Sequence, residues 1–249
     1  MQLQYPSLMA AVATSLNGSI GNFTQEPPKN FGFVLYDSFD VLDISGSIEP
    51  LYLLSSSHQL NLSLIAESMA PVYMRPAANE TNPVHSHFQL SVNPTHTFED
   101  PPQDLDVLFV PGGGGERLGN ITAAVDFVRN TYPRVKYLIT VCTGAGVAAR
   151  AGLLDGKRAT TNKASWDKII PLGKGVQWTS PARWVVDGNI WTSSGVTAGI
   201  DLMFAFIEKF YGKDIAHRIQ AVTEHKRTFD PCDDPFAAIN NVPPSGHCK

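Results

Sequence analysis

Short apolar runs alternate along this chain with longer stretches of mixed apolar and polar residues. Continuous apolar runs are typical of strands that are buried on both faces of a sheet, and longer mixed stretches are typical of helices that pack through one face. The predicted strands span residues 31–36, 60–66, 106–110, 137–141 and 158–161. The predicted helices span residues 45–55, with Ser45 as N-cap, 121–131, 163–170, 197–211 and 213–224.

Two stretches predict antiparallel pairs. Residues 71–95 alternate weakly, which indicates a short hairpin or an edge excursion, and Asp187-Gly188 between 183–186 and 189–192 is a strong hairpin signal. Helix 197–211 is apolar nearly all round and should be buried. The alternation of strands and helices predicts an α/β fold with a mostly parallel sheet that helices cover on both faces.

The composition divides the chain into three parts. Residues 1–29 are rich in Ser, Asn, Gln and Pro and form an N-terminal extension, residues 30–227 form the α/β domain, and residues 228–249 form a C-terminal tail of loop. Residues 7–15 are weakly apolar and lack a preceding basic region. They are either a weak signal peptide or part of a disordered tail.

Charge and hydropathy exclude several classes of partner. The 249 residues are 43% hydrophobic and 17% charged, with a net charge of −4 and a pI near 5.9. No basic block points to nucleic acid, and no apolar run approaches the roughly 18–20 residues that span a bilayer. We therefore expect neither nucleic acid nor membrane as a partner, but a small molecule.

The compartment stays open between cytoplasm and secretion. Five N-x-S/T sequons, at Asn17, Asn22, Asn61, Asn79 and Asn120, are compatible with the secretory pathway, although such sequons also arise by chance in Asn-rich chains. Of the three cysteines, Cys232 and Cys248 lie in the C-terminal tail and could form a disulfide that pins it.

The segment around the third cysteine, Cys142, is the most informative part of the chain. A β-rich run ends there and is followed by Thr143, by the small residues Gly144 to Gly146, and by a helix-like stretch. This order predicts a nucleophile elbow with a thiol at its apex. A thiol at a helix N-terminus is expected to have a lowered pKa. The alternative is a buried structural cysteine at the end of a core strand.

Three chemically suggestive segments follow predicted strands, so we expect them to meet at one edge of the sheet. Asp43 follows the first strand and could move a proton or orient water, with Glu49 as the competing carboxylate. Residues 112–115 are four glycines after the third strand, and their amides can turn into a pocket. Cys142 and Thr143 follow the fourth strand.

The histidines give little reason to expect a metal. His85 and His87 have strand-like spacing, but no third ligand is placed near them by any pattern. His225 lies at the end of the last helix, where a surface position is the common outcome. No metal site is predicted.

Four segments resemble the ThiJ/PfpI superfamily, whose fold is flavodoxin-like and similar to class I glutamine amidotransferases. They are FVLYDSFDVLDISGSIEP, DVLFVPGGGG, ITVCTGAGVAARAGLLDGKRATTN and VVDGNIWTSSGVTAGIDL. The D-x-x-G, VCTG and TAGID segments look most like isonitrile hydratases, in which a cysteine attacks the isonitrile carbon and water releases an N-substituted formamide. The resemblance implies a homodimer that needs no cofactor.

The resemblance also implies roles for individual residues. Cys142 is expected to be the nucleophile, Asp43 its acidic partner, and Thr143 a supporting donor. Amides near Gly113 and Gly114 are expected to be the oxyanion-type donors. Several relatives carry a histidine where this chain has Asn162, which makes a Cys–His–acid triad doubtful and places Asn162 among the substrate-binding residues.

Two further functions are compatible with the same residues. Methylglyoxal conversion without glutathione is one, although those relatives generally use a glutamate beside the cysteine. A reactive-thiol redox sensor is the other. A hydratase for an apolar isonitrile needs an apolar cleft, for which Trp166, Trp178 and Trp184 are candidates, unless they belong to the core.

Overall fold

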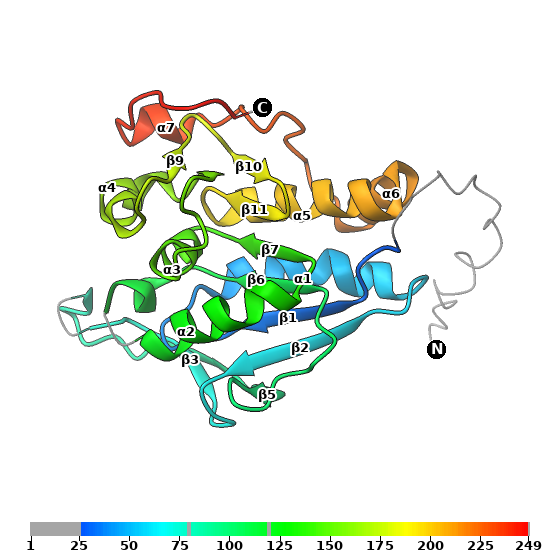
Figure 1. Cartoon of the computed structure of the whole chain (residues 1–249), viewed down its shortest axis with the longest axis horizontal. Coiled ribbons are helices and arrows are strands. Elements are labelled where there is room, and N and C mark those ends of the chain that lie inside the picture. Colours follow the sequence, from blue (N-terminus) through cyan, green and yellow to red (C-terminus); the bar gives the residue numbers. More distant parts are fainter. Residues whose placement is uncertain (1–25, 79–80, 119–120, 249) are drawn as a thin grey trace, which may run out of the picture.

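The computed structural model describes residues 26–78, 81–118 and 121–248. Its centre is a seven-stranded sheet of order β10-β11-β7-β6-β1-β2-β5 (Figure 1). All neighbours in it run parallel except β10 and β11. The strands are β1 Asn30–Val34, β2 Asn61–Ala66, β5 His96–Thr97, β6 Val107–Val110, β7 Tyr137–Thr140, β10 Trp184–Asp187 and β11 Ile190–Ser193. This sheet confirms the predicted fold class.

Two small sheets lie outside the central one. Strands β3 (Val72–Met74) and β4 (Leu90–Val92) pair antiparallel, which confirms the hairpin predicted within residues 71–95. Strand β8 (Arg158–Ala159) pairs in parallel with β9 (Gln177–Trp178), a strand that the sequence pattern did not predict.

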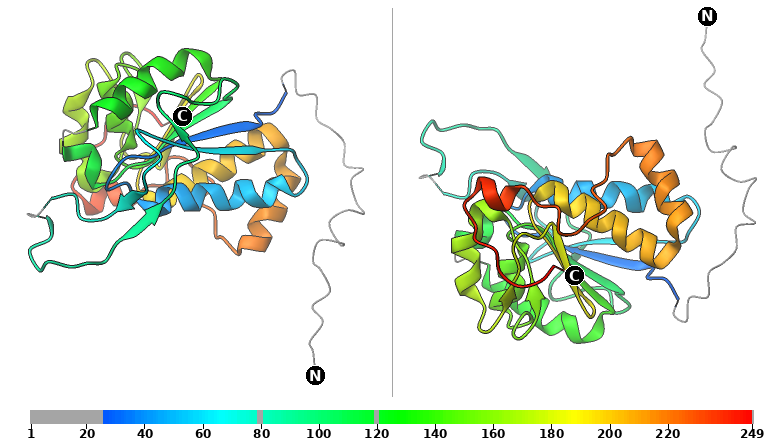
Figure 2. Two further views of the ribbon diagram at one scale, coloured as in Figure 1. Left: turned by 90° about the horizontal axis from the view of Figure 1, so that it is seen from below. Right: turned by 90° about the horizontal axis from the view of Figure 1, so that it is seen from above.

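Helices cover both faces of the sheet (Figure 2). Helices α1, α5 and α6 pack against one another on one face, and α2 and α3 lie on the other. The helices are α1 Val41–Ser55, α2 Thr122–Thr131, α3 Gly144–Arg150, α4 Trp166–Ile169, α5 Val196–Tyr211, α6 Lys213–Thr223 and α7 Phe236–Ile239. Short 3-10 turns are η3 Gly114–Leu118, η4 Tyr132–Arg134, η5 Lys163–Ser165 and η6 Ile170–Leu172. Within the described residues, no helix has the length and apolar character needed to cross a membrane.

Two predicted helices differ from the structure. Helix α1 begins at Val41 rather than Ser45, because the Asp40 side chain accepts a hydrogen bond from the Leu42 amide at 3.1 Å and caps the helix earlier. The helix predicted over 163–170 is instead η5, α4 and η6 in succession. Pro171 lies in that last turn, where it cannot donate the backbone hydrogen bond of a continuing helix.

The chain beyond Thr228 is not all loop. It contains α7, and Cys232 and Cys248 form the disulfide that the sequence suggested. Ala237 and Val242 pack with Trp166 in a small apolar cluster of their own. The predicted signal or tail at residues 7–15 lies outside the described residues, as do the sequons except Asn61, which is exposed at the start of β2.

Candidate active site

Cys142 is at the apex of a tight turn between β7 and α3. Its backbone has φ +58°, a left-handed conformation that strains a side-chain-bearing residue by about 1–3 kcal/mol. The Cys142 amide donates to the Ser194 carbonyl oxygen at 2.9 Å, and the Cys142 carbonyl accepts from Thr161 Oγ1 at 2.9 Å. This geometry confirms the predicted strand–turn–helix elbow with Cys142 at its apex, while the role of Cys142 as nucleophile stays a prediction.

Two glycines allow the elbow to pack closely against the neighbouring strand. A Cβ on Gly144 would lie 2.3 Å from the carbonyl oxygen of Val110. A Cβ on Gly112 would lie 2.6 Å from the Thr143 amide nitrogen and 2.9 Å from Cys142 Cβ. All three distances are shorter than real Cβ contacts, so these positions need glycine to bring the loop after β6 against the elbow.

Asp43 reaches the same place from the first turn of α1. Its side chain is buried, and its Oδ2 accepts a hydrogen bond from the Gly112 amide at 2.7 Å. Because Gly112 also packs against Cys142, this hydrogen bond brings the carboxyl group beside the elbow. Asp43 Oδ1 is buried and has no hydrogen-bond partner among the described residues. The competing carboxylate, Glu49, is exposed on α1 and does not take part.

Burial sets the protonation state of Asp43. The pKa of Asp43 is raised from 3.8 to about 8, chiefly by loss of hydration and further by the nearby charge of Asp40, while the hydrogen bond from the Gly112 amide opposes both effects. At neutral pH the Asp43 carboxyl group is therefore mostly protonated. An acid that holds its proton in this range can deliver it in a reaction.

The Cys142 thiol behaves differently from the sequence prediction. Burial raises its pKa, and the charge of Asp43 raises it further, while the Thr143 amide and the Asn162 side chain oppose the increase through hydrogen bonds to the sulfur. The expectation of a lowered thiol pKa was wrong, because desolvation outweighs the N-terminus of α3, which has only seven residues. The thiol keeps its proton at neutral pH.

The Thr143 side chain contacts the backbone of the glycine loop. Its hydroxyl accepts a hydrogen bond from the Gly113 amide at 2.9 Å, and this contact ties the glycine loop to the elbow. The Gly113 amide therefore already donates a hydrogen bond to Thr143. It could act as the expected oxyanion donor only if that hydrogen bond were broken. Gly114 begins η3 and packs near Ala77, and its role as a donor stays a prediction.

Asn162, which was expected among the substrate-binding residues, lies beside the elbow. Its Oδ1 accepts from the Ser165 amide at 3.1 Å, and its side chain also bonds the Cys142 sulfur. Asn162 therefore contacts the thiol as expected of a residue at the reacting centre, but it offers a hydrogen bond rather than a proton.

A mostly apolar cavity of about 240 Å³ lies next to Asn162. Its lining comprises Asn162, Lys163, Ala164, Arg183, Ser194, Gly195, Val196, Thr197, Ala198, Phe236 and Asn240. No tryptophan lines it. Trp166 and Trp184 are buried in the protein instead, which confirms for these two the alternative that they belong to the core.

Sequence reasoning missed a charged network on the far side of this cavity. Asp201, buried in α5, accepts from Arg183 Nε at 2.7 Å and lies 2.7 Å from His225 Nε2 through its other oxygen. His225 is partly exposed and stacks on Phe204, so it is held in place by Asp201 and Phe204 although it reaches the surface. The available signal was Asp201 itself, since a carboxylate within an apolar helix needs buried partners.

Tyr36, at the end of the first strand, was also missed. Its hydroxyl donates to the Pro111 carbonyl oxygen at 2.6 Å, just before the glycine loop. Burial raises the pKa of Tyr36, and the charge of Asp43 raises it further, so the phenol remains protonated and acts as a fixed donor beside the site.

His85 and His87 are exposed in the region between β3 and β4. Over residues 26–78, 81–118 and 121–248, no group of three or more His, Cys, Asp or Glu side chains is arranged to hold a metal ion.

Comparisons with known proteins place this geometry in context. The sequence pattern of the DJ-1/PfpI family matches residues 39–209. An isonitrile hydratase from Pseudomonas putida is 36% identical over 197 residues, which cover 78% of this chain and 77% of that protein. The transcriptional regulator GbdR from Pseudomonas aeruginosa is 26% identical over 80% of this chain, which spans 52% of the regulator.

A solved structure of a ThiJ/PfpI family protein from Pseudomonas syringae has the same fold. It superimposes with a TM-score of 0.68 and 25% sequence identity, and the match covers 87% of this chain and 85% of that one.

Proposed function

Since the chain belongs to the DJ-1/PfpI family, we propose that it is a cysteine-dependent hydratase that converts a small isonitrile into an N-substituted formamide. The single observation that carries the proposal is the junction at Gly112, which holds a protonated Asp43 beside Cys142. Similarity to an isonitrile hydratase over most of both chains supports the substrate class.

The first step joins the thiol to the substrate. Cys142 Sγ attacks the terminal carbon of R–N≡C while Asp43 gives its proton to that carbon and takes the proton that leaves the thiol. One S–C bond and one C–H bond form, and the product is the thioimidate R–N=CH–S–Cys142. The raised pKa values of both groups suit this relay, because neither charged form need exist at rest.

The second step consumes water. Water adds to the thioimidate carbon as its proton passes to the substrate nitrogen, which gives R–NH–CH(OH)–S–Cys142. Breaking the C–S bond then releases R–NH–CHO, and the hydroxyl proton returns to the sulfur through Asp43. The Asn162 side chain and the Thr143 amide, which already bond the sulfur, stabilise the charge that develops on it as it leaves.

The site offers a reason to favour hydration over amide hydrolysis. Cleavage of an amide needs a base that activates the nucleophile and then protonates an amine, a role usually filled by histidine. Here Asn162 bonds the sulfur and cannot carry a proton.

The test is formation of the formamide. Purified protein is mixed with cyclohexyl isonitrile, and the N-formamide is followed by mass spectrometry for wild type, Cys142→Ala, Asp43→Asn and Glu49→Gln. We expect turnover by wild type and by Glu49→Gln, no turnover by Cys142→Ala, and a loss of about 10²–10⁴-fold in Asp43→Asn. Full activity in Cys142→Ala would contradict the mechanism.

Turnover by none of the proteins, wild type included, would reject the hydratase proposal. It would favour a non-catalytic role, as the similarity to a transcriptional regulator allows. The expected homodimer and the compartment stay predictions.

A further inference from the structure

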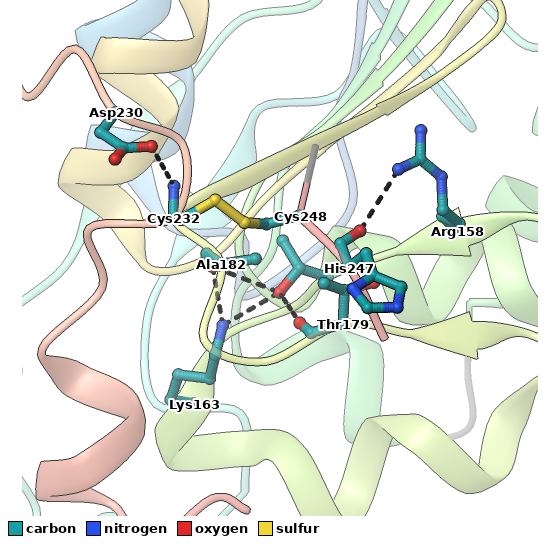
Figure 3. Close-up of a disulfide and its surroundings, with 9 residues drawn as sticks. Arg158, Lys163, Thr179, Ala182, Asp230, Cys232, His247 and Cys248 are labelled. Atoms are coloured by element: carbon teal, nitrogen blue, oxygen red, sulfur yellow. Dashed lines mark hydrogen bonds between the residues drawn. A yellow bond between two sulfur atoms is a disulfide. The ribbon is translucent and has the colours of Figure 1, made fainter. Parts of the chain in front are cut away.

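The C-terminal segment, residues 230–248, is fixed to the domain at several points. Its Ser245 pairs in both directions with Ser180, at 2.8 and 2.6 Å, and the Pro231 carbonyl accepts from the Arg183 amide at 2.6 Å. The disulfide between Cys232 and Cys248 closes the segment into a loop (Figure 3). A segment held at both ends in this way can present side chains in fixed positions.

A buried ion pair fixes the first part of the segment, just after Cys232. Asp234 Oδ2 lies 2.9 Å from Lys163 Nζ, and each side chain is 1% exposed. Lys163 Nζ also donates to Thr160 Oγ1 at 2.9 Å, the Ala182 carbonyl at 2.9 Å and Ser194 Oγ at 3.1 Å. The Asp234 Oδ1 accepts from the Phe236 amide at 3.2 Å, so the ion pair also sets the start of α7.

Two residues of this segment, Phe236 and Asn240, line the 240 Å³ cavity. The lining also includes Asn162, whose side chain bonds the Cys142 sulfur, and Ser194, whose carbonyl accepts from the Cys142 amide. The cavity is therefore lined both by two residues that contact Cys142 and by two residues of the C-terminal segment.

The charges around the cavity are balanced. Lys163 is paired with Asp234, and Arg183 is paired with Asp201 at 2.7 Å. The remaining lining is mostly apolar. A cavity with paired charges and apolar walls favours a neutral, apolar group, because a charged ligand would lose hydration without gaining a free counter-charge. Its volume is below the roughly 300–1,000 Å³ of sites for drug-sized ligands, so the group is small.

Resting on the hydratase function proposed above, we propose that this cavity binds the N-substituent of the substrate, a compact apolar group such as a six-membered ring. Phe236 forms the wall that determines which substituents are accepted. The C-terminal segment is thus part of the substrate-binding site, and the disulfide and the Lys163–Asp234 pair serve to position that wall.

The experiment compares a small and a large N-substituent, methyl and cyclohexyl, on two kinds of reagent: isonitriles and maleimides. In the first arm, kcat/KM is measured for methyl and cyclohexyl isonitrile. In the second arm, the rate of Cys142 alkylation by N-methylmaleimide and N-cyclohexylmaleimide is followed by mass spectrometry. With the disulfide intact, Cys142 is the free thiol of the chain, so labelling reports on that sulfur alone.

The variants are Phe236→Ala and the matched control Ile239→Ala. Ile239 is an apolar residue of the same short helix, but it is 68% exposed and does not line the cavity. We expect Phe236→Ala to reduce the cyclohexyl-to-methyl ratio about 10-fold in both arms, since one wall of an apolar pocket is lost. Ile239→Ala should keep the wild-type ratio. Phe236 is 47% exposed, so its truncation should leave the fold intact.

Each result decides the matter. An unchanged ratio in Phe236→Ala or an equal fall in Ile239→Ala would overturn the assignment of the cavity. If wild type hydrates neither isonitrile but the maleimide ratio still falls in Phe236→Ala alone, the hydratase function fails while the cavity remains the binding site for the group carried to the thiol.

Discussion

Replacing Asp43 by asparagine should make the stability of the protein less sensitive to pH. Asparagine has nearly the same shape, and its side-chain oxygen can still accept the hydrogen bond from the Gly112 amide. It cannot ionise. The variant therefore removes the titration of a buried carboxyl group while it keeps the junction that holds the group in place.

The magnitude follows from the raised pKa. The pKa of Asp43 is about 8 in the folded protein and near 3.8 when unfolded, so between these values the folded state binds more protons. The group's contribution to stability is fully present below pH 3.8 and is lost as the pH rises through 8. The loss is about 1.4 kcal/mol per pH unit, which gives about 3 kcal/mol between pH 5 and pH 7.

The assay is urea unfolding of wild type and Asp43→Asn at pH 5, 6 and 7, followed by tryptophan fluorescence. The change in unfolding free energy from pH 5 to pH 7 is compared between the two proteins, so the titration of all other groups cancels. Wild type should lose about 3 kcal/mol more than the variant, a difference of about 6–12 °C in Tm for a chain of this size.

Parallel pH dependences for wild type and Asp43→Asn would refute the reasoning, because they would show that Asp43 titrates alike in the folded and unfolded states. The control is Glu49→Gln, an exposed carboxylate of the same helix. Its stability difference from wild type should not change over this range of pH.

Two further predictions concern the C-terminal segment. Asp234→Asn should lower the unfolding free energy by about 3–5 kcal/mol, because it leaves the Lys163 ammonium buried without a counter-charge, and the exposed neighbour Asp233→Asn should have little effect. Urea midpoints measure both, and equal midpoints for the two variants would contradict the role of the pair. Joint replacement of Cys232 and Cys248 by serine should cost about 3 kcal/mol, since the bond closes a loop with a sequence separation of 16. A thermal midpoint equal to that of wild type would show that the other contacts suffice.

Much of the fold could be predicted because its strands are continuous apolar runs with glycine or a polar residue at their ends. The strand that leads to Cys142 is such a run, and the small residues after it leave little choice but a tight turn. The sequence prediction was wrong where neighbouring residues compete for the same local role, or where an element is very short. Asp40, rather than the expected Ser45, is the N-cap of α1. Strand β9 has only two residues, which is too short for a recognisable alternation of apolar and polar residues.

The sequence by itself determined the α/β class, the elbow at Cys142 and the convergence of Asp43 with it, because parallel strands all end at one edge of the sheet. Only the tertiary structure decided the chemistry of these groups. Burial raised the pKa of Asp43 and of the thiol, against the expectation from the helix dipole, since desolvation depends on neighbours from distant segments. The tertiary structure also decided the cavity wall at Phe236, because a disulfide and a buried ion pair bring the end of the chain back to residues that contact Cys142.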